Sequence, residues 1–246
     1  MNNLHVFPDS GAMAEALALR VKEGVERAVS ENRLYSVVLS GGETASNVYR
    51  QFAEPGVSKQ IPWESIHIFW TDERCVPPES GESNFGVAYH SFLKSISIPE
   101  KNIHRMRGEA DPDIESVRYD KEVQEHLALR SNSKNFFDVV FLGLGTDGHT
   151  ASLFPGQEEI MKTPRLCEVA RHPETGQSRM TLTPSAIQRS SRIAYHVIGQ
   201  KKAGIVSELV LESAQRKKYP AAHILGEWYL DKAAASNLGS SEQDSN

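Results

Sequence analysis

Cysteine is scarce in this sequence: Cys75 and Cys167 are the two present in 246 residues, and they lie far apart along the chain. Such a pair provides neither a disulfide framework nor the closely spaced thiols of a metal site. The sequence therefore predicts a protein of a reducing compartment, which we take to be the cytoplasm.

Long apolar runs and an N-terminal targeting pattern are also missing. The longest apolar stretch, residues 136–144, contains Asp138 and Gly143 and is far shorter than the roughly 20 residues that cross a bilayer as a helix. The first eight residues show neither the basic nor the apolar region of a signal peptide. We expect no interaction with a membrane.

Positive charge is in deficit, since 27 Lys and Arg face 32 Asp and Glu, for a net charge of −5. A surface that binds nucleic acid needs an excess of basic side chains, so nucleic acid is not an expected partner. A small anionic substrate remains compatible, because a few well-placed cations bind it. The shares of hydrophobic residues (39%) and charged residues (24%) are ordinary for a globular protein.

The pattern that is present alternates short apolar strands with amphipathic helices. Strands are predicted at residues 4–7, 35–39, 66–70, 103–106, 137–142, 167–170, 180–182, 193–198 and 228–230, and helices at 44–53, 84–93, 113–129, 203–211 and in a first helix capped by Ser10. This alternation favours an α/β fold with a mostly parallel sheet and helices on both faces. We predict a single domain over residues 1–235 and a disordered tail over 236–246.

Three polar clusters follow predicted strands, at residues 40–44, 71–74 and 143–149. Ligands of such folds bind beyond the carboxyl ends of the strands. The architecture would therefore gather the three clusters at one rim of the sheet.

The first cluster contains Ser40, Gly41 and Gly42 between a strand and a helix. The glycines let the backbone approach an anion, and the helix that follows offers free N–H groups, an arrangement that suits a phosphate. The same residues also fit a simple tight turn. No lysine follows the glycines, so the cluster is not a nucleotide-binding P-loop.

The second cluster contains Asp72 and Arg74. The carboxylate could orient a polyol, and the guanidinium could hold a phosphate with two parallel hydrogen bonds. A surface ion pair is the alternative interpretation.

The third cluster, residues 143–148, matches the pattern G-x-G-x-x-G of dinucleotide sites, with Glu168 as a possible ribose ligand. Pro155 interrupts the long helix that such a site requires. In the alternative interpretation, the glycines shape a loop that presents Asp147 and His149, and a histidine beside a carboxylate is a candidate general base. The other eight histidines show no ligand spacing with cysteines or carboxylates, so we expect no metal and no cofactor.

Several stretches together resemble the 6-phosphogluconolactonase family: residues 39–42, 69–77, 83–85 and 143–156, with weaker matches at 179–183 and 199–203. The resemblance implies a Rossmann-like fold of the sugar-phosphate isomerase/lactonase type. It also implies hydrolysis of 6-phospho-D-glucono-1,5-lactone to 6-phospho-D-gluconate in the oxidative pentose phosphate pathway. The partner would then be a phosphorylated sugar lactone, and the protein a monomer or small homo-oligomer.

The resemblance also implies roles for individual residues. Those implied to bind the substrate and its phosphate are Ser40, Gly41, Gly42, Arg74, Arg179 and Lys202. Those implied to be catalytic are His149 as general base, Asp147 beside it and Asp72 as the acid of the site. Two positions depart from the family pattern: Glu43 stands where a small hydroxyl or a glycine is usual, and Ala45 where proline is usual.

Three other functions compete with this one. A sugar-phosphate isomerase or deaminase could share the fold, but the deaminases resembling this loop carry a glutamate five residues after the histidine, where this chain has Phe154. A non-catalytic sugar-phosphate sensor would need the phosphate loop without Asp72, Asp147 and His149 together. An NAD-dependent dehydrogenase is the third alternative.

Overall fold

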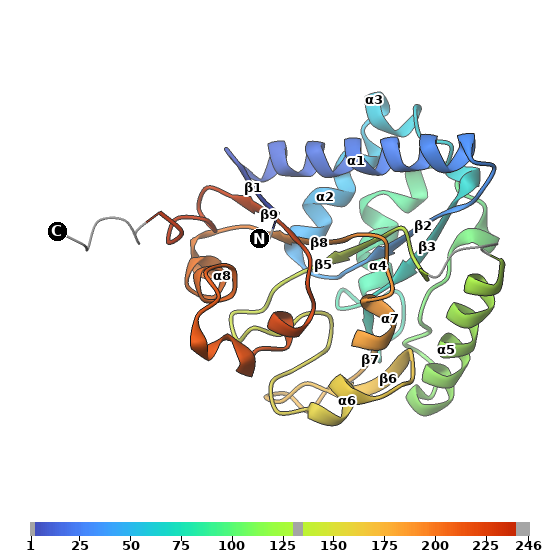
Figure 1. Cartoon of the computed structure of the whole chain (residues 1–246). Helices are drawn as coiled ribbons and strands as arrows, with labels where there is room; N and C mark the ends of the chain where they lie inside the picture. Colours follow the sequence, from blue (N-terminus) through green and yellow to red (C-terminus); the bar gives the residue numbers. More distant parts are fainter. Residues whose placement is uncertain (1–2, 130–134, 240–246) are drawn as a thin grey trace.

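A six-stranded sheet forms the centre of the computed structural model, which describes residues 3–129 and 135–239 (Figure 1). Its strands, in sheet order, are β1 (Leu4–Phe7), β9 (Glu227–Asp231), β8 (Ile193–Val197), β5 (Val139–Leu142), β2 (Tyr35–Leu39) and β3 (Ile66–Trp70). Every neighbouring pair in this sheet is parallel. The predicted α/β class with a mostly parallel sheet is confirmed.

Helices cover both faces of the sheet. The helices are α1 (Ser10–Ser30), α2 (Glu43–Ala53), α3 (Pro55–Ser58), α4 (Asn84–Ser91), α5 (Pro112–Leu129), α6 (Glu158–Lys162), α7 (Pro184–Ile187) and α8 (Ala203–Val210). Short 3₁₀ helices lie at Trp63–Ser65, Leu93–Ser95, Glu100–Asn102, Gln200–Lys202, Ala214–Lys218 and Pro220–His223. Within the described residues, no helix combines the length and the apolar character needed to cross a bilayer.

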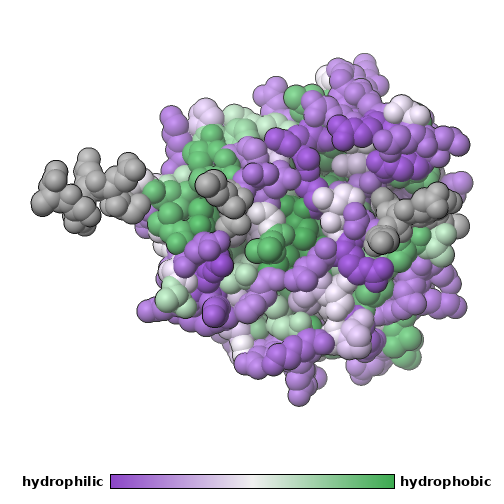
Figure 2. All heavy atoms as spheres, viewed as in Figure 1, coloured by the Kyte–Doolittle hydropathy of each residue, from purple (hydrophilic) through white to green (hydrophobic). Residues whose placement is uncertain are grey.

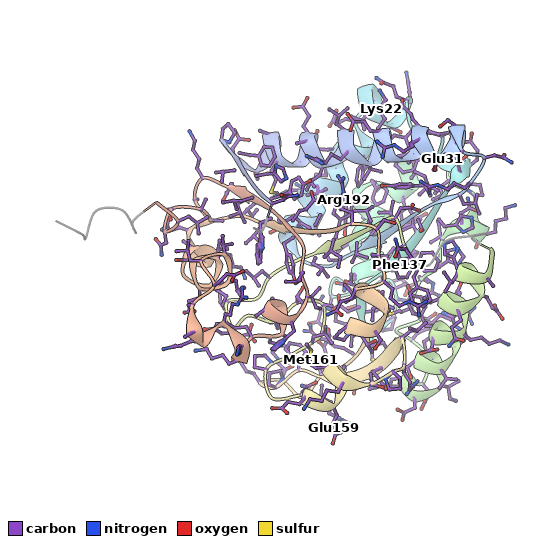
Figure 3. The ribbon with its side chains drawn as sticks, in the orientation of Figure 1. Lys22, Glu31, Phe137, Glu159, Met161 and Arg192 are labelled. Carbon is purple, nitrogen blue, oxygen red and sulfur yellow. The ribbon has the colours of Figure 1, made fainter. Side chains whose placement is uncertain are left out.

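The side chains along each strand point alternately to the two faces of the sheet, and the core is accordingly divided into two clusters. In β5, Val139 and Phe141 pack with α1, α2 and α4, whereas Val140 and Leu142 pack with α5 and α8. Phe137, just before β5, is buried in the second cluster (Figure 3). Successive side chains of a strand point to opposite faces, and β5, which is buried on both sides, is apolar at all of its positions.

Helix α1 shows how the sequence sets a boundary. The side chain of Asp9 accepts a hydrogen bond from the backbone N–H of Ala12 at 2.9 Å, so Asp9 is the N-cap and Ser10 is the first helical residue. The predicted cap at Ser10 was therefore wrong by one residue. The outer face of α1 carries largely hydrophilic side chains (Figure 2).

A small antiparallel sheet that the sequence did not predict as a unit lies beside the main one. Its order is β4 (Asp72–Arg74), β7 (Ser178–Leu182) and β6 (Cys167–Arg171). Thr71 joins the two sheets, because its N–H donates to Leu39 O at 2.8 Å and its carbonyl accepts from Leu182 N–H at 2.6 Å. Residues 103–106, predicted as an extended piece, contribute an isolated bridge from Ile103 to Ile68.

Of the tail predicted over residues 236–246, the part from residue 240 onward lies outside the described residues. Residues 236–239 form turns and bends, and Leu238 is partly buried against the core cluster on the α5 and α8 side.

Candidate active site

The carboxyl ends of β2, β5 and β8 open into a cleft of about 710 Å³. Strands β2 and β5 are neighbours, but the chain continues from β2 to β3 on one side and from β5 to β8 on the other. Such a switch point is where doubly wound α/β folds bind ligands. The lining includes Ser40, Gly41, Gly42, Asp72, Arg74, His149, Arg179 and Lys202. The fold thus brings residues from the three polar clusters into one cleft.

Asp147 does not line the cleft itself but contacts the histidine that does. Nδ1 of His149 lies 2.6 Å from Oδ1 of Asp147. A carboxylate only accepts hydrogen bonds, so Nδ1 is the donor, and in the neutral imidazole Nε2 is then the nitrogen with the lone pair. Partial burial raises the pKa of Asp147, but the hydrogen bond and charge of His149 outweigh it and lower this pKa to about 2. Asp147 is therefore ionised at neutral pH and holds the imidazole in one tautomer.

Two glycines shape the loop that carries this pair. A Cβ on Gly145 would lie 2.2 Å from Nδ1 of His149 and 2.3 Å from Oδ1 of Asp147. Gly148 has a φ of +79°, and a Cβ there would lie 2.3 Å from Cδ1 of Tyr219. The glycine pattern therefore shapes the loop that carries the histidine.

The surroundings of the loop argue against a dinucleotide site. The chain after Gly148 runs through turns, and the next helix, α6, begins only at Glu158 and has five residues. Glu168 does not line the cleft. It lies in β6, where its carboxylate accepts hydrogen bonds from Thr163 Oγ1 at 2.9 Å and from Arg165 Nη1 at 2.8 Å.

Asp72 is 5% exposed and is fixed from two sides. Its Oδ1 accepts from Thr71 Oγ1 at 2.9 Å, and its Oδ2 accepts from Ser152 Oγ at 2.8 Å. A carboxylate with its rotamer held in this way can position a hydroxyl group of a ligand in the cleft.

The buried carboxylate of Glu73 holds together the segments that form one wall of the cleft. Its carboxylate accepts hydrogen bonds from the backbone N–H groups of Arg74, Asn84 and Phe85 and from Ser83 Oγ. Burial raises the pKa of Glu73, and these four bonds only partly offset that effect. The carboxylate thereby connects β4 to the N-terminus of α4.

Asn84 is a cleft residue for which the sequence analysis gave no role. It is 1% exposed, and its Nδ2 donates to the Asp72 carbonyl at 2.8 Å. Its Oδ1 has no hydrogen-bond partner in the part of the chain that the structure describes, and a Cβ on Gly41 would lie 1.9 Å from that atom. A buried acceptor of this kind is costly unless a ligand satisfies it. The only sequence signal was its place in a stretch that resembles the family.

Arg74 and Arg179 are direct cross-strand partners in the small sheet. Like charges opposite each other destabilise a strand pair. Burial lowers the pKa of Arg179, and the charge of Arg74 lowers it further. Among the described ion pairs, none includes either arginine, and Nε of Arg74 has no hydrogen-bond partner there. Arg74 Nη1 donates to the Glu82 carbonyl at 2.5 Å, and Arg179 Nε donates to Gln177 Oε1 at 3.3 Å. Both partners are neutral, so the two positive charges at the cleft are available to a ligand anion.

Lys202 contributes a third cation from the loop after β8. Burial lowers its pKa, while the charge of Asp147 raises it. The backbone N–H of Gly199 donates to Asp231 Oδ1 at 3.0 Å, which fixes this loop against the end of β9. Lys201 also lines the cleft, and because it is adjacent to Lys202 the resemblance leaves open which of the two lysines contacts the phosphate. Gln200, for which the sequence indicated no role, lines the cleft as well.

The glycine turn after β2 faces the same space. Gly42 is the N-cap of α2 with a φ of +93°, and nothing lies within 4 Å of the position of a Cβ there. Ser40 is fixed by two buried side chains. Its Oγ lies 2.9 Å from Nε2 of His196, and its carbonyl accepts a hydrogen bond from Tyr49 Oη at 2.5 Å. The side chain of Glu43, which departs from the family pattern, lies outside those the structure describes.

Comparison with known proteins identifies what the chain is similar to. A sequence profile described as glucosamine-6-phosphate isomerases/6-phosphogluconolactonase matches residues 8–230. A 6-phosphogluconolactonase of Haemophilus influenzae is 38% identical over 88% of this chain and 96% of its own length. One of Synechocystis is 35% identical over 92% of this chain and 94% of its own length. A crystal structure of devB protein superposes with a TM-score of 0.87 and 36% identity, covering 97% of this chain and 100% of that one.

Proposed function

This chain belongs to the glucosamine-6-phosphate isomerase/6-phosphogluconolactonase family, and from that premise we propose that it hydrolyses 6-phospho-D-glucono-1,5-lactone to 6-phospho-D-gluconate. Its similar relatives are 6-phosphogluconolactonases, so it is an ester hydrolase that acts on a lactone. One observation carries the assignment of the site. The His149–Asp147 pair and the opposed Arg74 and Arg179 meet at one cleft, which offers a base and an anion site within the reach of one sugar phosphate.

The substrate is held at its phosphate end. Arg74, Arg179 and Lys202 neutralise the phosphate charge, and the turn at Gly41 and Gly42 brings backbone N–H groups toward it. Asp72 and Asn84 then accept hydrogen bonds from sugar hydroxyls, which satisfies Asn84 Oδ1. In the proposed binding mode, the lactone carbonyl faces His149.

Hydrolysis proceeds through direct attack of water. Nε2 of His149 takes a proton from a water molecule as its oxygen adds to C1, and the carbonyl electrons move onto the carbonyl oxygen. The tetrahedral intermediate then expels the ring oxygen, which takes the proton back from the imidazolium, so that a carboxylic acid and a free hydroxyl remain. A lactone is an activated ester, so no covalent intermediate with the protein is needed. A positioned base contributes about 10²–10⁴ in rate.

The competing activities on this fold are less well supported. Phe154 is buried and its ring centroid lies 4.9 Å from that of His149, at the position where the resembling deaminases carry a glutamate. A phenyl ring moves no proton, so the site lacks that acid for isomerisation or deamination. A pure sensor would have no use for a carboxylate that fixes the tautomer of a cleft histidine.

The test is a coupled assay for 6-phosphogluconate, with spontaneous hydrolysis of the lactone subtracted. We expect His149→Ala to lose at least about 100-fold in kcat. His90→Ala is the matched control, since His90 is exposed on α4 and does not line the cleft. Full activity of His149→Ala would remove this residue from the mechanism, whereas binding of substrate by the wild type without turnover would favour the sensor.

Three wider assignments belong to the same proposal. We place the reaction in the oxidative pentose phosphate pathway and the protein in the cytoplasm, acting as one catalytic domain over residues 1–235. The support is the family resemblance together with Cys75 and Cys167, which are both free thiols.

A further inference from the structure

Three histidines that are far apart in the sequence meet on the α5 side of the sheet, away from the cleft. His67 lies in β3, His104 follows the 3₁₀ helix Glu100–Asn102, and His126 lies near the end of α5. One ring nitrogen of each lies within 4.8 Å of the others. The spacing in the sequence predicts no metal site here, because tertiary packing alone brings the three rings together.

The distances bracket those of a metal site with three histidine ligands. Nδ1 of His67 donates a hydrogen bond to Nε2 of His104 at 2.8 Å, since Nδ1 of His104 donates to Glu122. A metal ion bound by both nitrogens would take the place of the shared proton. Tetrahedral zinc with nitrogen ligands at about 2.0–2.1 Å needs nitrogens roughly 3.3 Å apart. That separation falls between 2.8 Å and the 4.8 Å limit of the cluster, so small side-chain movements suffice.

A carboxylate holds one of the rings as in metal centres. The Nδ1 atom of His104 lies 2.7 Å from Oε1 of Glu122. Histidines that bind metals almost always donate their second ring nitrogen to such a partner, which fixes the tautomer and strengthens the other nitrogen as a ligand. The hydrogen bond to Glu122 therefore directs the lone pair of His104 Nε2 toward His67.

The surroundings combine a rigid apolar wall with access from solvent. The ring of Phe69 stacks on His104 at 4.3 Å between centroids and contacts His126 at 4.8 Å. The side chains of His104 and Glu122 are 14% and 26% exposed, so this side of the cluster is in contact with solvent. Arg118 pairs with Glu122 and leaves its other oxygen to His104.

We propose that His67, His104 and His126 bind one divalent transition-metal ion of the zinc class, with Glu122 orienting His104. Imidazole nitrogen suits Zn²⁺, Co²⁺ and Ni²⁺. None of the three histidines lines the cleft, so the proposed ion lies outside it. The ion would link β3 to α5 and take no part in lactone hydrolysis.

The test is titration of the full-length, chelator-treated protein with Zn²⁺ by calorimetry, and with Co²⁺ followed by visible absorption. We expect one ion per chain and the strong visible bands of tetrahedral cobalt. His104→Gln and His126→Gln should abolish the tight site, and Glu122→Gln should weaken it about 10–100-fold. His90→Gln, which changes an exposed histidine outside the cluster, should bind as the wild type does.

A further variant distinguishes loss of the metal ligand from loss of folding. His67→Asn keeps a short polar group beside His104 and removes the imidazole ligand, so it should fold but lose the cobalt spectrum. Excess Zn²⁺ should raise the Tm of the wild type and not that of His67→Asn. Absence of one-to-one binding to the wild type, or an unchanged Kd in His104→Gln and His67→Asn, would overturn the proposal. Either result leaves the lactonase assignment intact, because that assignment rests on the cleft.

Discussion

Oδ1 of Asp147 lies 2.6 Å from Nδ1 of His149, two residues later in the same loop. The pair is local in the chain, yet its geometry depends on the absence of a side chain at Gly145. An ionised carboxylate at this distance sets which nitrogen of the imidazole accepts a proton. The first two predictions follow from this contact.

Replacing Asp147 by asparagine should reduce kcat by about 10²–10⁴, the range that a positioned base supplies. The amide is a donor as well as an acceptor, so it permits the tautomer in which Nε2 carries the proton and cannot act as a base. KM should change little, because the phosphate contacts remain. Steady-state kinetics of Asp147→Asn would check this, and wild-type kcat would show that tautomer control is unimportant here.

Gly145→Ala should impair catalysis through crowding alone. The added methyl would lie 2.2 Å from Nδ1 of His149 and must displace the ring or the loop. We expect a loss of kcat of at least about 10-fold, since small misplacements of a catalytic group are costly. Gly204→Ala in α8 is the matched control, because nothing lies within 4 Å of its Cβ position. Equal activities of the two variants would refute the steric argument.

Arg179→Ala should raise KM by about 10–100-fold, because a hydrogen bond to a charged group contributes about 1.5–3 kcal/mol. The free protein should not lose stability, since the substitution relieves the repulsion between Arg179 and its cross-strand partner Arg74. Kinetics and thermal melts without substrate test both halves of the prediction. A lower Tm with unchanged KM would assign Arg179 a structural role instead.

Stability should fall as the pH drops from about 6.5 to 4, because of His196 beneath the glycine turn. Burial lowers the pKa of His196 from 6.5 to about 4. In this window the unfolded chain binds a proton that the folded state excludes, so stability increases with pH, by about 3 kcal/mol in total.

Urea unfolding across that pH range, for the wild type and His196→Gln, isolates this contribution. The variant should show a flatter dependence on pH, because its amide does not titrate. Parallel curves for the two proteins would mean that His196 is protonated equally in the folded and unfolded states.

Local sequence patterns predicted most of the fold. The strands at residues 4–7, 35–39 and 66–70 match β1, β2 and β3 residue for residue. In β2 and β3, runs of β-branched and aromatic residues are buried on both faces and give a strong signal, whereas β1 is an edge strand with Leu4 and Val6 exposed. Strand β4 was missed as a strand, because Asp72, Glu73 and Arg74 carry no apolar pattern and are extended only through pairing with β7.

The candidate site also has some features that local sequence predicts and others that depend on tertiary structure. Asp147 and His149 are two residues apart, and Gly41 and Gly42 are adjacent, so both features can be read along the chain. The opposition of Arg74 and Arg179 depends on strand register across a long separation, and the position of Asn84 depends on capping by the carboxylate of Glu73. No local pattern encodes these relationships, nor the convergence of the three histidines.

Thr71 has a consequence for the motion of the cleft. Its amide is bonded into the large sheet and its carbonyl into the small one, so neither of the peptide units on either side of it can rotate without breaking one of these bonds. The walls that carry Ser40, Asp72 and Arg179 should therefore move as one body. In hydrogen–deuterium exchange, the amides of Thr71 and Leu182 should be among the slowest, opening only when the whole molecule unfolds.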